Sequence, residues 1–265
     1  MKNVKKIAAL TLSAVLCLGM LTACGGDKDK AADLKTIEEG KLILSTNSDF
    51  SPWCILADDG SFEGIDYEFA AKIAEKLGLE LVIDDMGFDA ALTAVQNGQS
   101  DVAMGGVSIT EDRKAVMDFT DPYATGVQVV IVKEGSPVTM DNLGDYMIGT
   151  QLGTTGYLYA SDTPENGGYG EDHVIGYDGG AMAVQALING TVDAVIIDDK
   201  PAQEYVKANP TAGLTILEGT WVEEDYAIGV QKGNTAMLEA LNKALKELKE
   251  DGTLQGIMDM YIKAD

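Results

Sequence analysis

The chain has 265 residues, enough for one or two domains of ordinary size, and 46% of them are hydrophobic. Its formal net charge of −24 at pH 7 argues against nucleic acid or an anionic lipid surface as a partner. The only histidine, His173, lies in a glycine-rich stretch without histidine or cysteine companions, so the sequence predicts no metal site. It also contains no glycine-rich phosphate loop, and we expect no cofactor.

The first 23 residues have the pattern of a signal peptide for export. Lysines precede an apolar run over residues 7–21 that is too short and too often interrupted to span a membrane. The sequence Leu-Thr-Ala-Cys at 21–24 then resembles a bacterial lipobox, in which a diacylglycerol is attached to the cysteine. We therefore expect Cys24 to carry acyl chains such as palmitate, which anchor the protein to the outer face of the cytoplasmic membrane. Residues 24–33 would form a flexible tether; an ordinary signal peptide with a chance cysteine is the alternative.

The cysteines predict no internal disulfide bond. Cys17 would leave with the signal peptide and Cys24 would be lipidated, so Cys54 has no partner. We expect Cys54 to act as a small apolar filler.

Strands and helices alternate along the rest of the chain. Lys41–Thr46 is an apolar run typical of a strand, and 64–77 is a predicted helix that Gly78 ends. The alternation continues through 79–83, 88–96, 102–104, 146–150, 181–188 and 194–197. Near the end, Asn234 is expected to cap a helix with a stripe of leucines, and Thr253 begins a last short helix. This pattern predicts an α/β protein with mostly parallel sheets.

The sequence also contains an internal echo. Residues 95–103 resemble 187–195: in each copy a helix ends at Asn-Gly, and an aspartate then opens a strand. A weaker echo pairs 42–47 with 147–152. We interpret the echoes as two lobes of similar construction, although helix–glycine–strand units also recur by chance in α/β proteins.

Oppositely charged residues follow the two echoed strands. Arg113 comes after the first, and Asp198 and Asp199 come after the second. Ligands of open α/β sheets bind beyond the carboxyl ends of the strands. A zwitterion held between two lobes would fit this arrangement, because arginine binds a carboxylate in a bidentate manner and aspartate binds an ammonium group.

Five segments together resemble the polar amino-acid-binding proteins, which are the family 3 solute receptors of ABC importers. They are GIDYEFAAKIAEKLG at 64–78, DVAMGGVSITEDR at 101–113, MDFTDPY at 117–123, GTQLGTTG at 149–156 and VDAVIID at 192–198. The resemblance implies a type II periplasmic-binding-protein fold with mixed sheets, in which two α/β lobes are joined by two crossover strands that act as a hinge. Lobe 1 would hold residues 34–129 and 227–265, and lobe 2 residues 130–226. It further implies a monomeric receptor, without catalytic residues, that delivers a free amino acid to a membrane permease.

The resemblance also implies roles for single residues at the two ends of the ligand. Arg113 and Ser108 match contacts to the α-carboxylate, and the carbonyl of Gly106 matches a contact to the α-ammonium. In the other lobe, Thr155 matches a backbone donor to the carboxylate, with Thr154 beside it. Asp198 matches the aspartate that binds the ammonium, and Asp199 is the alternative one residue away.

Other positions bear on the ligand side chain. Phe50 and Phe88 match an aromatic clamp, and Trp53 is either a pocket or a core residue. Asn47 stands where relatives that bind basic amino acids commonly have an acid. Gln151 stands where glutamine binders have a lysine. A polar or neutral ligand side chain is therefore slightly favoured.

Further residues near the predicted pocket leave this preference open. Asp49, beside the first clamp residue, could replace the missing acid or could point outward, and Gln128 could form a hydrogen bond with a ligand side chain.

Two other functions remain as alternatives at this point: an enzyme on the same fold, like the cyclohexadienyl dehydratases, or the ligand-sensing partner of a membrane receptor. Because the motifs supply no spare general acid or base, we do not expect an enzyme.

Overall fold

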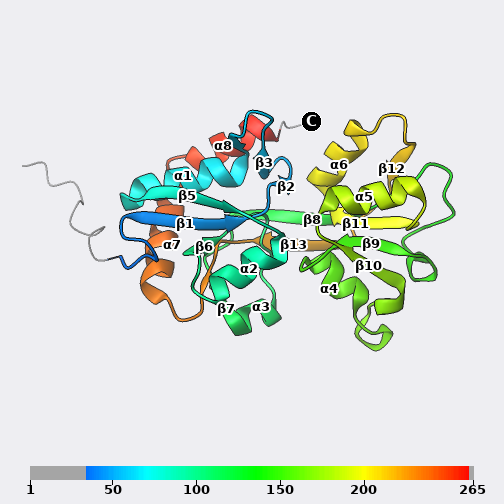
Figure 1. Ribbon diagram of the computed structural model, residues 1–265, viewed down its shortest axis with the longest axis horizontal. Helices are drawn as coiled ribbons and strands as arrows, with labels where there is room; N and C mark the ends of the chain where they lie inside the picture. The colour runs from blue at the N-terminus through cyan, green and yellow to red at the C-terminus, as the bar shows by residue number, and fades with distance from the viewer. Residues whose placement is uncertain (1–33, 263–265) are drawn as a thin grey trace, which may run out of the picture.

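The computed structural model describes residues 34–262, which form two lobes lying side by side (Figure 1). The predicted signal peptide, the lipidation site Cys24 and the tether lie outside these residues. Within them, no helix combines the length and the apolar character that a membrane span requires. Each lobe is built on its own β-sheet with helices on both faces.

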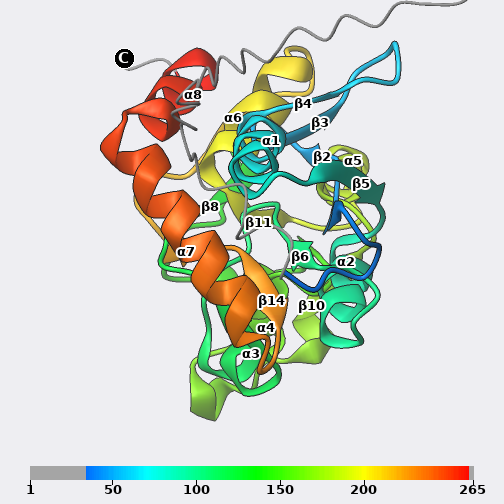
Figure 2. The ribbon, with the colours of Figure 1, turned by 90° about the vertical axis from the view of Figure 1, so that its left-hand side faces the viewer.

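Lobe 1 contains a five-stranded mixed sheet. The strand β1 (Lys41–Thr46) pairs in parallel with β5 (Glu80–Asp85) and with β6 (Val102–Ala103). The strand β14 (Gly229–Gln231) runs antiparallel to β6, and β7 (Met117–Phe119) runs antiparallel to β14. One face is covered by α1, α7 and α8, and the other by α2, while α3 precedes β7 (Figure 2). The bounds of these helices are Ile65–Leu77 (α1), Phe88–Gln96 (α2), Glu111–Val116 (α3), Thr235–Glu250 (α7) and Thr253–Tyr261 (α8).

Lobe 2 contains a six-stranded mixed sheet. Its strands are β8 (Ala124–Lys133), β9 (Ile148–Gln151), β10 (Val174–Tyr177), β11 (Ala194–Asp198), β12 (Leu214–Ile216) and β13 (Val222–Tyr226). The strand β9 is parallel to β10 and β11, whereas the long β8 is antiparallel to β11, β12 and β13. One face packs against α5 (Gly180–Asn189) and α6 (Asp199–Ala208), and the other against α4 (Thr155–Ser161). Short 3-10 turns at Leu143–Asp145, Pro164–Asn166 and Glu171–His173 complete the lobe.

The two sheets repeat one arrangement, which confirms the internal echo. The orders β5-β1-β6-β14 and β10-β9-β11-β8 correspond strand by strand. The helices α2 and α5 are each followed by a glycine in the left-handed region, Gly98 and Gly190, and then by the third parallel strand. In both copies the aspartate before that strand accepts a backbone hydrogen bond from the equivalent neighbouring segment, which is β1 in lobe 1 and the residue before β9 in lobe 2. Asp101 accepts from the N–H of Ile43 at 2.9 Å, and Asp193 from that of Met147 at 3.0 Å.

Two crossover strands join the lobes. Val222–Tyr226 of β13 pairs with Ala124–Gln128 of β8, so both connections run side by side between the sheets (Figure 1). Tyr226 packs in the core of lobe 1, and Val129 packs in the core of lobe 2. These contacts lie close to the predicted changes of lobe at 129/130 and 226/227.

A small three-stranded sheet precedes α1 and was not predicted. It consists of β2 (Asp49–Phe50), β3 (Cys54–Leu56) and β4 (Phe62–Glu63). Cys54 forms no disulfide bond within the described residues; its thiol is buried, and its Sγ lies 3.3 Å from Oγ1 of Thr46. Burial raises the pKa of this thiol, so it remains neutral and fills space in the core.

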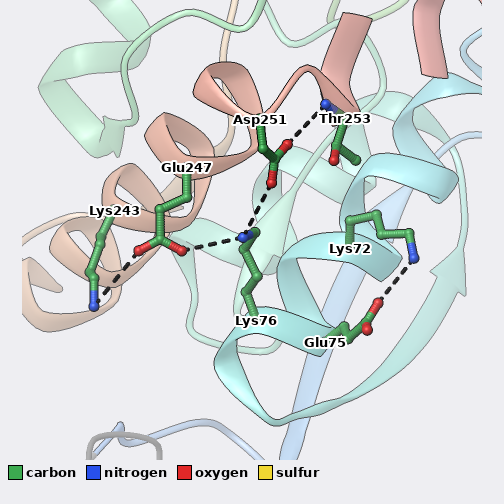
Figure 3. A network of polar contacts seen from close by, with 7 residues as sticks. All are labelled: Lys72, Glu75, Lys76, Lys243, Glu247, Asp251 and Thr253. Carbon is green, nitrogen blue, oxygen red and sulfur yellow. Dashed lines mark hydrogen bonds and ion pairs between the residues drawn. The ribbon is translucent and has the colours of Figure 1, made fainter. Parts of the chain in front are cut away.

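The helix α7 joins the end of the chain to lobe 1. The side chain of Asn234 accepts a hydrogen bond from the N–H of Met237, as expected for a cap. Of the predicted leucine stripe, Leu241, Leu245 and Leu248 are buried, whereas Leu238 is only partly buried. On the surface, Lys76 of α1 lies 3.3 Å from Glu247 and 3.7 Å from Asp251 (Figure 3). The side chain of Lys76 is 28% exposed and that of Glu247 is 45% exposed, so solvent screens this network and the apolar contacts dominate.

This comparison predicts unequal effects of two substitutions in the same seam. Leu245→Ala should lower the free energy of unfolding by about 2–5 kcal/mol, because it leaves a cavity under α7. Lys76→Met should change it by less than about 1 kcal/mol. Urea unfolding followed by circular dichroism measures both. Equal losses for the two variants would show that the surface network contributes as much as the leucine stripe to holding α7 in place.

Candidate functional site

A cavity lies between the lobes, where the carboxyl ends of strands from both sheets meet. Its volume is about 20 Å³, so a ligand the size of an amino acid fits only if lobes or side chains move. It is lined by Asn47, Phe50, Phe88, Gly105, Gly106, Ser108, Arg113, Gln128, Gln151, Thr154, Thr155 and Asp198.

Lobe 1 contributes residues that directly follow its parallel strands. Asn47 follows β1, Phe88 opens the helix after β5, and Gly105 and Gly106 follow β6. Gly106 has a φ of 61°, and a Cβ at this position would collide with the ring of Phe50. Glycine is therefore required here both by the backbone conformation and by the aromatic ring that packs on it.

Asp66 anchors the glycine loop, a role that the sequence analysis missed. Its carboxylate is fully buried at the start of α1 and accepts hydrogen bonds from the N–H groups of Gly105 at 2.8 Å and Gly106 at 3.1 Å. The hydroxyl of Tyr123 donates to the same carboxylate at 2.8 Å. Burial raises the pKa of Asp66 to about 6, against the lowering effect of these bonds. An aspartate in the first turn of a helix is usually an exposed partner of the helix dipole, so the position of Asp66 in the sequence does not indicate this role.

Arg113 is a buried cation that has no carboxylate partner among the described residues. It lies in α3, which the Thr110 side chain caps, and only 6% of the residue is exposed. Its Nη1 donates to the carbonyl of Ser108 at 2.7 Å, and its Nη2 donates to the carbonyl of Gly153 at 2.9 Å. The guanidinium carbon lies 5.6 Å from the centre of the Phe88 ring.

The setting of Arg113 excludes a surface ion pair with its neighbours. In the part of the chain that the structure describes, no acidic side chain lies within ion-pair distance of it, and Glu111 instead pairs with Lys114 at 2.9 Å. Burial lowers the pKa of Arg113, and the nearby charge of Glu224 opposes that effect. A guanidinium has five N–H donors, so Arg113 retains capacity to bind an anion.

Lobe 2 places an anion across from this cation. Asp198 ends β11 and is 8% exposed; the Tyr226 hydroxyl donates to its Oδ1, and the Gln128 amide lies 3.5 Å from its Oδ2. Burial raises its pKa to about 7, and the charges of Glu224 and Asp199 act in the same direction. Asp199 does not line the cavity, and its carboxylate lies 3.3 Å from the ammonium of Lys200. Of the two candidate aspartates, Asp198 therefore faces the cavity.

The remaining predicted residues of lobe 2 surround the start of α4. Gln151 ends β9, and Thr154 is the cap of α4, with its hydroxyl accepting from the N–H of Tyr157 at 3.2 Å. Thr155 is buried, and its hydroxyl accepts from the Gln128 amide at 3.0 Å.

Direct contacts hold the two lobes together in this structure. The Gln151 amide donates to Oδ1 of Asn47 at 3.1 Å across the cavity, and the Arg113–Gly153 bond also crosses it. Outside the cavity, Asp49 of lobe 1 accepts from the Tyr205 hydroxyl at 2.6 Å and from the N–H of Ala181 at 3.0 Å. Asp49 thus neither replaces a pocket acid nor points outward, the two possibilities that the sequence left open; it bridges the lobes.

Trp53, which the sequence assigns to either the pocket or the core, does not line the cavity. It is 3% exposed and packs in the lobe 1 core, with its ring centre 5.2 Å from that of Tyr226 and 6.5 Å from that of Tyr123. Its ring supports Tyr226, which in turn contacts Asp198, so Trp53 lies one layer behind the site. The described residues contain no cluster of histidine, cysteine or acidic side chains that could hold a metal ion.

Glu224 is a further buried acid beside the cavity, and the sequence analysis missed it. Its Oε2 accepts from the hydroxyls of Ser108 and Thr155, both at 2.7 Å. The segment Val222–Tyr226 contains three acidic residues in a row, and nothing in the sequence distinguishes the buried one.

Comparisons with known proteins agree with this geometry. A family model described as bacterial extracellular solute-binding proteins, family 3, matches residues 42–264. A probable histidine-binding protein of Neisseria gonorrhoeae is 32% identical over 98% of this chain and 96% of its own length. An arginine-binding extracellular protein of Bacillus subtilis is 31% identical over 98% and 99% of the two chains. The solved structure of an ancestral arginine-binding protein bound to glutamine is 37% identical, with a TM-score of 0.78, and covers 86% of this chain and 100% of its own. These relatives are binding proteins and not enzymes.

The raised pKa of Asp198 predicts a pH-dependent contribution to stability. A carboxyl with a pKa of about 7 in the folded state and an ordinary value of 3.8 binds more protons folded than unfolded between those values. Its contribution is therefore present at low pH and is lost as the pH rises through about 7. The difference in unfolding free energy between the wild type and Asp198→Asn should fall by up to about 1.4 kcal/mol per pH unit over this range.

Urea titrations from pH 4 to pH 8 on protein freed of small molecules measure this slope. Asp199→Asn is the matched control, because it removes the neighbouring acid and leaves Asp198 in place. A constant difference between the wild type and Asp198→Asn would show that Asp198 is not protonated in the folded state.

Proposed function

Because this chain belongs to the bacterial extracellular solute-binding proteins of family 3, we propose that it captures a free amino acid between its lobes and delivers it to the permease of an ABC importer. The observation that supports this most is the buried guanidinium of Arg113, which has no carboxylate partner within residues 34–262 and lies opposite the buried carboxylate of Asp198. Among the residues that line the cavity, the one cation and the one acid lie on facing lobes and match the two charges of an α-amino acid.

Each charged end of the ligand would find several partners. The free N–H groups of Arg113 and the backbone N–H of Thr155 would hold the α-carboxylate. Asp198 and the carbonyl of Gly106 would hold the α-ammonium, and the rings of Phe50 and Phe88 would enclose the side chain. Such pairing is needed, because burying either charge without a partner costs several kcal/mol. A hydrogen bond to a charged group contributes about 1.5–3 kcal/mol, so a few of them offset that cost.

Ligand binding and lobe closure would be coupled. Arg113 and Gly106 belong to lobe 1, whereas Thr155 and Asp198 belong to lobe 2. A ligand that contacts all four binds the closed form better than the open form, and it shifts the population toward the closed form by that difference. The permease would then distinguish loaded from unloaded receptor by the relative position of the lobes.

The ligand side chain is proposed to be polar and neutral, with basic amino acids as the next candidates. Asn47 and Gln151 bond to each other through their amides, and Asp49 is used in the contact between the lobes. None of these three provides a free carboxylate for a basic side chain. The relatives named for histidine and arginine keep basic ligands under consideration.

Arg113→Ala should abolish binding and leave the fold intact. Truncating one partner of a buried charge pair should weaken affinity by at least about 100-fold. Differential scanning fluorimetry against the twenty amino acids identifies the ligand, and calorimetry then compares the variants. Lys114→Ala is the matched control, because it removes the next cation along α3, an exposed one, and should bind normally.

Two outcomes would contradict the proposal. Normal binding by Arg113→Ala would show that the ligand does not use this cavity. The absence of a thermal shift with any of the twenty amino acids would remove the proposed ligand class.

We further propose that Cys24 carries the lipid that keeps the receptor beside its permease. The observation in favour is the order of the N-terminal segments: lysines, an apolar run and then the lipobox-like sequence Leu-Thr-Ala-Cys at 21–24. Two or three acyl chains would anchor the protein stably, where one would not.

Cys24→Ser should move the protein from the membrane fraction to the soluble extracytoplasmic fraction of a bacterium that processes lipoproteins. The wild-type protein should incorporate labelled palmitate, and the variant should not. Cys17→Ser, within the segment expected to be removed, is the control and should stay with the membrane. Equal membrane association of the wild type and Cys24→Ser would exclude lipidation at this cysteine.

A further inference from the structure

Glu224 occupies an unusual place for an acidic residue. It lies on the crossover strand β13 between the two lobes, and it is 8% exposed, whereas its neighbours Glu223 and Asp225 face solvent. Its Oε2 accepts from Oγ of Ser108 in lobe 1 and from Oγ1 of Thr155 in lobe 2, each at 2.7 Å. A single carboxylate oxygen therefore connects both walls of the cavity.

The charge of Glu224 is not neutralised by an ion pair. Within residues 34–262, no lysine or arginine lies within ion-pair distance of it, and its Oε1 is buried without any hydrogen-bond partner. Burying a carboxylate in this way is costly, so purely structural use is a poor explanation for it. Its field acts on the cavity residues: it raises the pKa of Asp198, in addition to the larger effect of burial, and opposes the burial-induced lowering for Arg113. The site therefore contains one cation and two carboxylates.

The hydrogen atoms of the two hydroxyls can be assigned from these contacts. A carboxylate only accepts hydrogen bonds, and a hydroxyl has a single hydrogen to donate. The hydroxyls of Ser108 and Thr155 therefore both donate to Glu224. Thr155 also accepts from Gln128, which leaves the oxygen of Ser108 as an acceptor beside the cavity. In this arrangement neither hydroxyl can donate to a ligand carboxylate.

We propose that Glu224 is a specificity-determining positioning residue of the amino-acid site. It fixes the Ser108 hydroxyl as an acceptor for the ligand ammonium, and its charge disfavours ligands with a second carboxylate. The site then selects α-amino acids with neutral or cationic side chains and rejects acidic amino acids and acids without an α-amino group. This inference rests on the proposed amino-acid binding and adds the class of ligand that is excluded.

The substitution Glu224→Gln tests this, because it removes the charge and nearly preserves the shape. Calorimetry with glutamine, arginine and glutamate gives the affinities. Glu224→Gln should lower the affinity for glutamine or arginine, whichever the wild type binds more tightly, by about tenfold. The preference for that ligand over glutamate should narrow by at least about tenfold, because repulsion of the second carboxylate is relieved.

The matched control is Glu223→Gln, which removes an equal charge from the solvent-facing side of the same strand. It should leave all three affinities unchanged. If Glu223→Gln narrows the preference as much as Glu224→Gln does, the effect is one of overall charge and the proposal is wrong. An unchanged preference in Glu224→Gln also overturns it.

A second variant covers the case in which Glu224→Gln does not fold, which its thermal midpoint would show. Ser108→Ala removes the proposed ammonium acceptor and retains Glu224. The wild type should bind glutamine at least about 100-fold more tightly than 4-carbamoylbutanoate, which lacks only the α-amino group. Ser108→Ala should narrow that ratio about tenfold. An unchanged ratio overturns the role of Glu224, whereas a wild type that binds none of the twenty amino acids overturns the proposed function itself.

Discussion

The Arg113 guanidinium is buried without a carboxylate partner in the part of the chain that the structure describes, and this constrains the rest of the site. A cation at 6% exposure is tolerated only if other groups satisfy its donors, and the carbonyls of Ser108 and Gly153 do so in part. Because one carbonyl belongs to each lobe, Arg113 acts on the position of both. Arg113 therefore has two roles: its positive charge can attract an anion, and its hydrogen bond to Gly153 connects the two lobes.

The repeated architecture explains how the opposite charge comes to face this cation. In both lobes the third parallel strand follows a helix that ends at a left-handed glycine, and its carboxyl end points toward the cavity. In lobe 1 this end is followed by Gly105 and Gly106, which line the cavity with backbone atoms and have no side chains that would block the approach of a ligand. In lobe 2 it is Asp198, which gives a carboxylate. Two copies of one fold thus supply complementary chemistry from equivalent positions.

This regularity also decides how much the sequence could predict. Strand ends are visible in the pattern of apolar runs and glycines, so Gly106 and Asp198 could be placed near one another before the structure was known. Asn47 and Gln151 were assigned to the same site only through the resemblance to the family. The roles of Asp66 and Glu224 depend on which side of a helix or strand turns inward after the lobes have packed. Local sequence does not encode that choice when acids occupy both faces, as in Val222–Tyr226. Trp53 is the opposite case, because it is close in sequence to site residues but does not reach the cavity. The ring of Tyr226, which comes from a distant part of the chain, packs between Trp53 and Asp198.

The contacts outside the cavity set a limit on how closure can depend on ligand. Asp49 accepts hydrogen bonds from the N–H of Ala181 and the hydroxyl of Tyr205 outside the cavity, so these bonds stabilise this arrangement of the lobes without any contact to a ligand. If they were strong, the cavity of about 20 Å³ would stay shut and no amino acid could enter. Asp49 is partly exposed, however, so water replaces its partners when the lobes separate, and such exchanged bonds contribute only about 0.5–1.5 kcal/mol each. They can therefore lower the free-energy difference between open and closed forms, but the charged contacts of the ligand must supply the rest.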